Sequence, residues 1–156
     1  IAWNERGLVG LCPPQPSKEA AVCRLDRTAG GESPLPGDLA QRLRRYCEGE
    51  SVTFNDPVDL SAGTPFQQRV WQALRQIPSG TTLTYGELAR RLGKPRAARA
   101  VGQALAANPI PIIVPCHRVV AAHGGLGGYT GAELSLKAEL LRLEAEAAAI
   151  QPRRTA

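Results

Sequence analysis

Apolar residues recur along the chain with two different spacings. The opening "IAWNERGLVGLC" places them in two short runs on either side of a polar turn at residues 4–7, which predicts a pair of short strands. Further on, Leu39, Leu43 and Tyr46 recur at helical spacing, so "GDLAQRLRRYCEG" is predicted to form an amphipathic helix. Gly49 is expected to end this helix. The segment between these elements finishes in a Gly- and Pro-rich stretch and is interpreted as a loop.

The stretch "FNDPVDLSAGTP" interrupts this periodicity and is interpreted as a linker at residues 57–63. A second unit begins at Thr64, which opens a T-x-x-Q capping box with proline at the first helical position. Thr84 opens another capping box before "LARRLG", and after the turn "GKP" a third helix, "RAARAVGQALAAN", is expected to end at Asn108. Two short helices joined by a tight Gly-containing turn are typical of a helix-turn-helix, although helical hairpins without DNA contacts share this pattern.

Length and charge narrow the class of protein. A chain of 156 residues can bury a core as one domain of ordinary size or as two small ones. No apolar run approaches the roughly 20 residues that span a bilayer and no leader is evident, so we expect a soluble, cytoplasmic protein of bacterial type. Residues 1–64 hold 7 Lys and Arg against 9 Asp and Glu, whereas residues 65–156 hold 12 against 5. The basic later part favours an anionic partner such as nucleic acid, or a surface charged for solubility alone.

Four cysteines are spread widely along the chain, and no two of them form a CxxC pair. Both disulfide-framework and zinc-finger spacings are therefore absent from the sequence. His117 and His123 are the only histidines, so we expect neither a metal site nor a cofactor. Cys12, Cys23 and Cys47 are interpreted as small buried or indifferent thiols.

The fourth cysteine follows "PIPIIVP", in which prolines alternate with large aliphatic residues. This segment is predicted to run extended, buried and stiff, and to hold Cys116 in a fixed place. A thiol attacks as its thiolate, with an unperturbed pKa near ~8.5, so it needs a base or a positive field. His117, Arg118 or a helix N-terminus could supply one; His117 would act through a bridging water, because neighbours in an extended segment face opposite sides. A carboxylate from "LSLKAELLRLEAEA" could orient the base, and the alternative is a buried structural thiol.

A longer pattern surrounds this cysteine. "RAVGQALAANPIPIIVPCHRVV", residues 99–120, has "TYGELA" before it and "GGYTG" after it. In these motifs the chain resembles the O6-alkylguanine-DNA alkyltransferase family, also called methylated-DNA–protein-cysteine methyltransferases. The resemblance is close over about residues 64–145 and looser before them.

The resemblance implies an α+β fold. A small N-terminal α/β domain with a sheet would be followed by a linker and by a mostly helical, winged-helix-like C-terminal domain that carries the helix-turn-helix. The expected boundaries are 1–56 for the first domain, 57–63 for the linker, 64–150 for the second domain and 151–156 for a tail.

The resemblance also implies roles at the site. Cys116 would receive the alkyl group, His117 would deprotonate the thiol through water, and Glu144 would orient His117. Tyr85 corresponds to a tyrosine that contacts the base and rotates a phosphate, and Asn108 to an asparagine that bridges the helix-turn-helix to the active-site segment.

The loop after residue 131 is one residue longer than the family pattern, which keeps Glu139 and Glu146 open as alternatives to Glu144. The family's pocket closes over the guanine with a loop that corresponds to part of "GGYTG". The residues expected in this substrate pocket are Val119, Tyr129 and Thr130.

The predicted third helix is dominated by Ala and Gly, which offer no hydrogen bonds to base edges. Such a helix is typical of a close-packed core, or of a close approach to a narrow groove. The resemblance implies a monomer that binds double-stranded DNA through the minor groove, with Arg99 as the finger that replaces an extruded nucleotide in the stack. The other residues expected at the DNA are Lys94, Arg96, Ala98 and Gln103.

The implied activity is the direct, irreversible transfer of the alkyl group from O6-alkylguanine, and also from O4-alkylthymine, in duplex DNA to Cys116. The transfer would follow base flipping. Each molecule would act once, because no nearby group can hydrolyse a thioether. Two other hypotheses remain: a non-catalytic protein that binds alkylated DNA, and a Cys-His hydrolase of thioesters or peptides, which would turn over.

Overall fold

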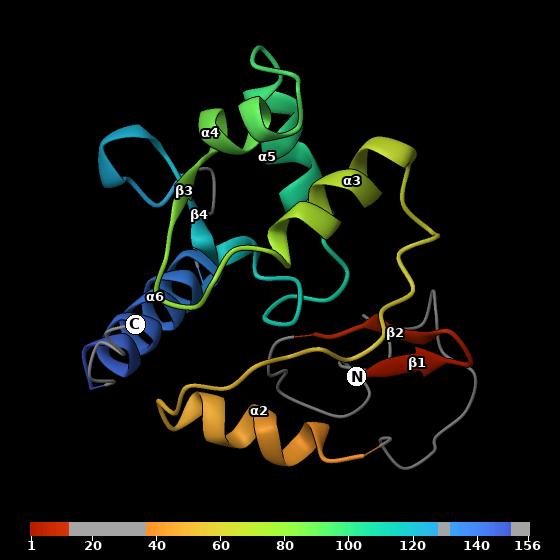
Figure 1. Cartoon of the computed structure of the whole chain (residues 1–156), viewed down its shortest axis with the longest axis vertical. Coiled ribbons are helices and arrows are strands. Elements are labelled where there is room, and N and C mark those ends of the chain that lie inside the picture. The colour runs from red at the N-terminus through yellow and green to blue at the C-terminus, as the bar shows by residue number, and fades with distance from the viewer. Residues whose placement is uncertain (13–36, 128–131, 151–156) are drawn as a thin grey trace, which may run out of the picture.

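The computed structural model describes residues 1–12, 37–127 and 132–150 (Figure 1). Helices and short strands are mixed, which confirms the α+β prediction in its coarse form. None of the helices in the described ranges is long and apolar enough to cross a membrane. The elements are β1 (Ala2–Asn4), β2 (Gly7–Gly10), α2 (Leu39–Cys47), α3 (Pro65–Leu74), β3 (Leu83–Thr84), α4 (Tyr85–Arg91), α5 (Ala98–Ala106), η1 (Cys116–Arg118), β4 (Val119–Val120), η2 (Ala122–Gly124) and α6 (Ala132–Ile150).

The predicted hairpin at the start of the chain is present, with β1 and β2 antiparallel. β2 also pairs with the segment interpreted as a linker, because the Leu8 N–H donates to the Pro57 carbonyl at 2.9 Å and the Asp59 N–H donates to the Leu8 carbonyl at 2.8 Å. Gly7 lies against this segment with φ +131°, and an added Cβ would stand 2.4 Å from the Pro57 oxygen. This close approach therefore requires glycine at position 7.

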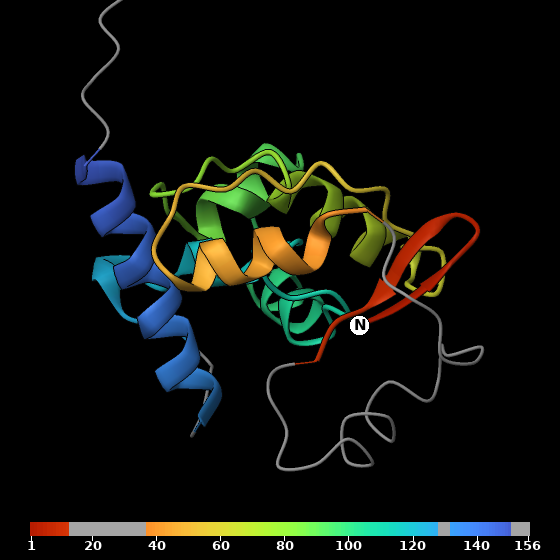
Figure 2. The same ribbon diagram turned by 90° about the horizontal axis from the view of Figure 1, so that it is seen from below.

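The predicted amphipathic helix is α2, and Gly49 follows it with φ +85°. Figures 1 and 2 show α2 between the β1–β2 hairpin at one end of the molecule and α6 at the other. Leu39 is buried toward the main core, whereas Tyr46 packs with Val52 and Leu140 in a second, smaller cluster. Helix α2 thus connects the hairpin side of the molecule to α6.

Both predicted capping boxes are confirmed. Thr64 accepts from the Gln67 N–H at 3.3 Å and donates its own N–H to the Gln67 side chain at 2.8 Å, with Pro65 as the first helical residue. Thr84 and Glu87 make the same reciprocal pair at the start of α4. Such a cap typically contributes about 1 kcal/mol to helix stability.

Helices α3, α4 and α5 pack around the main apolar core. Trp71 of α3 is buried, and its indole N–H donates to the Ala104 carbonyl of α5 at 2.8 Å. The third predicted helix begins later than expected, at Ala98, because the residues before it form a turn in which the Ala97 N–H donates to the Lys94 carbonyl at 2.9 Å. Lys94 and Arg96 therefore both lie in the turn between α4 and α5, and the prediction that Arg96 starts the helix was wrong.

The segment before the fourth cysteine is buried at residues 110 and 113–115 and half-buried at 109, 111 and 112, and it is not extended as predicted. Its chain turns at Ile112, which has φ +74°, and the Val114 N–H donates to the Ile110 carbonyl at 2.9 Å. Asn108 closes the turn, since its side chain accepts from the Ile110 N–H at 3.1 Å and donates to the Val114 carbonyl at 2.8 Å. The prediction was wrong because prolines fix φ and lack an N–H, so the segment cannot join a sheet ladder and satisfies its polar groups locally.

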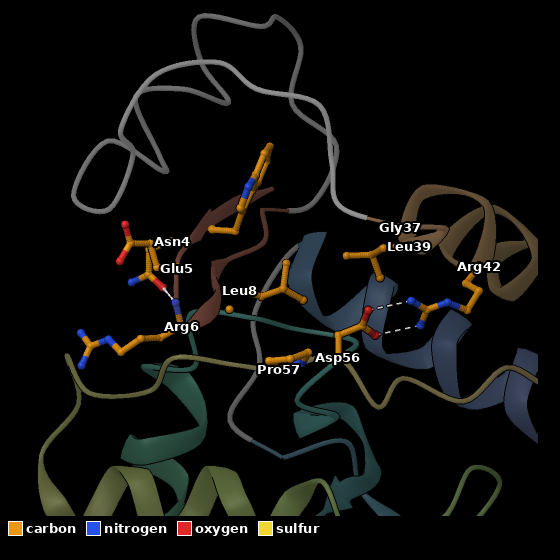
Figure 3. A pocket seen from close by; sticks show the side chains of 11 residues that line it. Asn4, Glu5, Arg6, Leu8, Gly37, Leu39, Arg42, Asp56 and Pro57 are labelled. Carbon is orange, nitrogen blue, oxygen red and sulfur yellow. Dashed lines mark hydrogen bonds and ion pairs between the residues drawn. The ribbon is translucent and has the colours of Figure 1, made fainter.

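A surface pocket of about 390 Å³ lies between the β1–β2 hairpin and the start of α2 (Figure 3). Trp3 contributes to its wall, and Arg42 donates to both oxygens of Asp56 at 2.8 and 2.6 Å beside it. Cys116 and His117 are not among the described residues that line this pocket. The pocket is therefore separate from the predicted site.

Candidate active site

Cys116 and His117 lie in η1, a single 3-10 turn held between two elements. On one side, β4 follows the turn and pairs in parallel with β3, so that Leu83 lies opposite Val119 and Thr84 opposite Val120. On the other side, α6 packs across η1. The parallel pairing brings the first residue of α4, Tyr85, to the same region as the cysteine.

His117 and Glu144 form a buried pair, with exposed fractions of 3% and 2%. The distance from His117 Nε2 to Glu144 Oε1 is 2.9 Å. The Arg118 guanidinium donates to both carboxylate oxygens, at 2.7 Å to Oε1 and 3.0 Å to Oε2, and the Gly80 N–H donates to Oε2 at 3.1 Å. The Tyr46 hydroxyl donates to Oε1 at 2.8 Å. The carboxylate is therefore fully supplied with donors, as a buried charge requires.

Burial and hydrogen bonding act in opposite directions on this pair. Burial raises the pKa of Glu144, but the hydrogen bonds from His117 and Arg118 outweigh it and hold this pKa well below its usual range. Burial lowers the pKa of His117 and outweighs the opposing effect of Glu144. The imidazole is therefore neutral at neutral pH. We assign its proton to Nε2, which faces the carboxylate, and this leaves a lone pair on Nδ1.

Nδ1 of His117 is buried, and the described part of the chain gives it no hydrogen-bond partner. Cys116, the preceding residue, is buried as well, and its backbone N–H donates to the Val114 carbonyl at 2.8 Å. A buried, neutral imidazole with an unpartnered lone pair, on the residue that follows a buried thiol, meets the requirements of a general base.

The expectation that Arg118 could supply a positive field to the cysteine does not fit its contacts. Its guanidinium binds Glu144 and the Ile77 carbonyl. The cation near Cys116 is Lys137 of α6, which is 1% exposed and donates to the Val119 carbonyl at 2.6 Å. Burial lowers the pKa of Lys137 to about 8, and its interaction with Cys116 opposes this shift.

The burial of Lys137 was not predicted, although the spacing of residues in α6 indicates it. One face of α6 is buried at Lys137, Leu140, Glu144 and Ala147, at spacings of three, four and three residues. Two ionisable residues on an otherwise apolar helical stripe are rarely buried without a partner. That stripe distinguished both residues from the exposed carboxylates of the same helix.

The alternatives to Glu144 lie on the exposed face of α6. Arg142 donates to Glu139 at 2.5 Å and to Glu146 at 2.6 Å, and both carboxylates are exposed. Only Glu144 of these three lies beside His117. The extra residue in the preceding loop therefore does not change which carboxylate faces the histidine.

Tyr85 lies between α5, the loop after η2 and α6. The Lys137 ammonium lies 5.9 Å from the centre of its ring. An added Cβ at Gly102 would stand 3.7 Å from the ring, and one at Gly127 would stand 2.4 Å from the hydroxyl oxygen. Gly127, which also has φ +80°, thus lets the backbone pass directly beside the Tyr85 hydroxyl.

The remaining predicted site residues fall into three groups. Asn108 closes the turn before the cysteine, and the carbonyl of buried Val119 accepts from Lys137. Tyr129 and Thr130 lie outside the described residues. The predicted DNA-facing side chains lie on α5 and the turn before it, where Lys94, Arg96, Arg99 and Gln103 are exposed and Ala98 is half-buried.

Comparison with known proteins identifies the class to which this fold and site belong. The family model of the 6-O-methylguanine DNA methyltransferase DNA-binding domain matches residues 65–146. A constitutive methylated-DNA–protein-cysteine methyltransferase of Bacillus subtilis is 45% identical over 120 residues, which cover 77% of this chain and 72% of that protein. The methyltransferase of Salmonella typhimurium is 50% identical over 109 residues, which cover 70% of this chain and 63% of that protein.

A solved structure agrees with these matches. The crystal structure of Mycobacterium tuberculosis OGT in complex with DNA superposes with a TM-score of 0.66 at 51% identity, over 70% of this chain and 66% of that one. The chain belongs to the 6-O-methylguanine DNA methyltransferase family, which confirms the resemblance drawn from the sequence.

Proposed function

We propose that this protein repairs alkylated DNA by transferring the alkyl group of O6-alkylguanine in duplex DNA to Sγ of Cys116. The observation that carries the proposal is the buried neutral His117, which directly follows Cys116, is held by Glu144, and has an Nδ1 lone pair without a partner among the described residues. A structural thiol would need no such base. The family relationship supports the same reading.

The reaction is a displacement at a saturated carbon. The thiol proton of Cys116 passes to Nδ1 of His117 through a bridging water, and Glu144 stabilises the imidazolium that forms. The thiolate attacks the alkyl carbon, an S–C bond forms and the C–O6 bond breaks. The electron pair of that bond leaves with the guanine, so the product on the protein is a thioether and the protein acts once.

The leaving guanine gains negative charge that a donor must stabilise. The Tyr85 hydroxyl donates a hydrogen bond or a proton to the base as it leaves. The Lys137 ammonium lies 5.9 Å from the centre of the Tyr85 ring and interacts electrostatically with Cys116, so it would favour negative charge that develops at either group. An alkyl group on O4 of thymine is attached in the same manner, and we extend the proposal to O4-alkylthymine on that ground.

Helices α4 and α5 would act as a helix-turn-helix that enters the minor groove. The half-buried Ala98 and the small residues of α5 permit a close approach, and Arg99 would fill the stack after the target base is extruded. Because the parallel β3–β4 pair joins the start of α4 to η1, docking of these helices would bring the extruded base to Cys116.

The proposal is tested by intact mass after mixing the protein with a duplex that contains O6-methylguanine. We expect a mass gain of one methyl group, located on Cys116 by peptide mapping, and one equivalent of guanine restored per protein. Tight binding without a mass gain would identify a lesion-binding protein instead. Repeated turnover without a mass gain would identify a hydrolase.

A further inference from the structure

Cys116, His117 and Glu144 form the proposed proton relay. One residue that contacts this relay lies outside the segment matched by the family model. Tyr46 is in α2, whereas the match covers residues 65–146. Its side chain is 3% exposed, and its hydroxyl oxygen lies 2.8 Å from Glu144 Oε1 and 3.3 Å from His117 Nε2. We propose that Tyr46 is a positioning residue for the transfer reaction, because its hydroxyl shares Oε1 of Glu144 with His117 and so keeps the imidazole neutral and able to accept the thiol proton.

The geometry fixes the direction of each hydrogen bond. Nε2 of His117 directs its proton to Oε1 at 2.9 Å, so it cannot also accept from a hydroxyl 3.3 Å away. The Tyr46 O–H therefore donates to Oε1, which accepts from Arg118 as well. Burial, together with the negative charge of Glu144, raises the pKa of Tyr46, so the hydroxyl keeps its proton and remains a donor.

Tyr46 should lower the pKa of His117, because both residues donate a hydrogen bond to the same oxygen, Oε1 of Glu144. A carboxylate stabilises the imidazolium of a neighbouring histidine and so raises its pKa. The Tyr46 hydroxyl draws on the same oxygen and weakens this influence. Besides Glu144, the charged groups that act on His117 are its neighbour Arg118 in η1 and Lys137 of α6, and both of these cations disfavour the imidazolium. Tyr46 therefore acts in the same direction as these two cations without carrying a charge.

The position of the hydroxyl is set by packing around the ring. Phe54 meets the Tyr46 ring edge to face, with centroids 5.6 Å apart and an interplanar angle of 70°. Val52 and Leu140 bury the remainder of the ring, and the strained Ile112 packs against the same cluster. Because these contacts involve the ring and not its oxygen, the hydroxyl can be removed while the packing is retained.

The first test is Tyr46→Phe, followed by nuclear magnetic resonance titration of His117. The chain has two histidines, and His123 is exposed, so the imidazole signals are readily told apart. We expect the His117 pKa to rise by roughly one unit, since a hydrogen bond to a charged group has this order of influence on its basicity. An unchanged His117 titration in the folded variant would overturn the proposal.

A control separates the hydroxyl from its packing. Val52→Ala removes apolar contact from the same cluster and leaves the hydroxyl, so we expect lower stability and an unchanged His117 titration. An equal shift in both variants would mean that Tyr46 acts only through packing. This readout requires a folded protein but no substrate.

The inference rests on the proposed function for its meaning in catalysis, and a second assay tests that link. With free O6-benzylguanine, the acidic limb of the pH–rate profile of Tyr46→Phe should move to higher pH by the same amount as the titration, because His117 then protonates earlier. A shifted titration with an unmoved rate profile would overturn the positioning role. A wild-type protein that transfers nothing would contradict the proposed function and leave the titration result standing.

Discussion

The relay around Glu144 keeps its charged groups buried and hydrogen-bonded, whereas the turn between α4 and α5 exposes its charged groups. At the relay, four groups from three parts of the chain donate to one buried carboxylate: Tyr46 from α2, Gly80 from the segment before β3, and His117 and Arg118 from η1. At the turn and on α5, the basic side chains of Lys94, Arg96 and Arg99 are exposed.

The difference reflects what each region has to accomplish. Transfer of a proton to a particular nitrogen requires fixed atoms, and burial makes each misplaced charge costly. Contact with phosphates along a duplex needs reach and positive charge, and neither depends on one rotamer. Substitutions should therefore have large, specific effects at the relay and small, additive ones at the turn.

The largest effect is expected for Cys116→Ser. The hydroxyl keeps the volume but lacks thiolate nucleophilicity, so alkyl transfer should be abolished while affinity for duplex DNA is retained. Intact mass measures alkyl transfer, and gel-shift titration measures the affinity for duplex DNA. Residual transfer would contradict the assignment of the nucleophile.

The next largest effect is expected for Glu144→Gln. The variant removes the charge that orients His117 and pairs with Arg118, so the transfer rate should fall by about 10²-fold or more, in the range of general-base catalysis. Breaking a buried pair should also cost about 3–5 kcal/mol of unfolding free energy. Transfer to free O6-benzylguanine and urea titration measure the two effects. Glu146→Gln, on the exposed face of the same helix, is the matched control and should change neither.

Arg99→Ala should separate the two regions. Repair of duplex DNA should slow by at least roughly tenfold, because stabilisation of the extruded state is lost, while reaction with the free base continues. Single-turnover rates on both substrates provide the measurement. Equal losses on both would place Arg99 in the chemistry or the fold.

Acid should destabilise the protein through the relay. The folded-state pKa of His117 lies below its ordinary value of 6.5, so as pH falls through 6.5 the unfolded chain takes up a proton that the folded chain does not. The free energy of unfolding should then fall by up to about 1.4 kcal/mol per pH unit, and Glu144 should add a second loss below about pH 4.5. Urea midpoints from pH 8 to 4 measure this. His123→Gln is the control and should leave the curve unchanged.

The smallest effect is expected at the turn. Neutralising Lys94 and Arg96 should weaken binding to all duplexes alike and should flatten the slope of log affinity against log salt by about 0.9 for each lost phosphate contact. Fluorescence anisotropy across a salt series provides the measurement. If affinity and slope both stayed unchanged, these side chains would not face the DNA.

The local features of the fold could be predicted because their causes are local. Thr64 and Thr84 start helices with side chains three residues away, and Gly49 follows α2 where its positive φ is needed. The turn at Ile112 could not be predicted, because a β-branched residue adopts φ +74° only where surrounding contacts over-determine it. Those contacts come from α2 and α6, distant in sequence.

The site shows the same division. The family resemblance drawn from the motif around Cys116 implied Glu144 as the partner of His117, with Glu139 and Glu146 as alternatives, whereas Lys137 and Tyr46 were not predicted. Tyr46 lies on the apolar face of an amphipathic helix, where its ring satisfied the helical pattern and its hydroxyl left no signal. Its role depends on a contact between α2 and α6, because Tyr46 and Glu144 are 98 residues apart in the sequence.

The indole of Trp71 has a consequence for how the molecule can be observed. The chain contains two tryptophans: Trp71 is buried with its N–H bonded to the Ala104 carbonyl, and Trp3 is half-buried in the wall of the surface pocket. An indole enclosed in apolar surroundings fluoresces at shorter wavelength than one in contact with water. Emission from Trp71 therefore reports on the packing of α3 against α5, and emission from Trp3 on the β1–β2 hairpin. In a Trp3→Phe variant, the remaining indole emission comes from Trp71 of α3, which packs against α5, one of the two helices proposed to meet DNA.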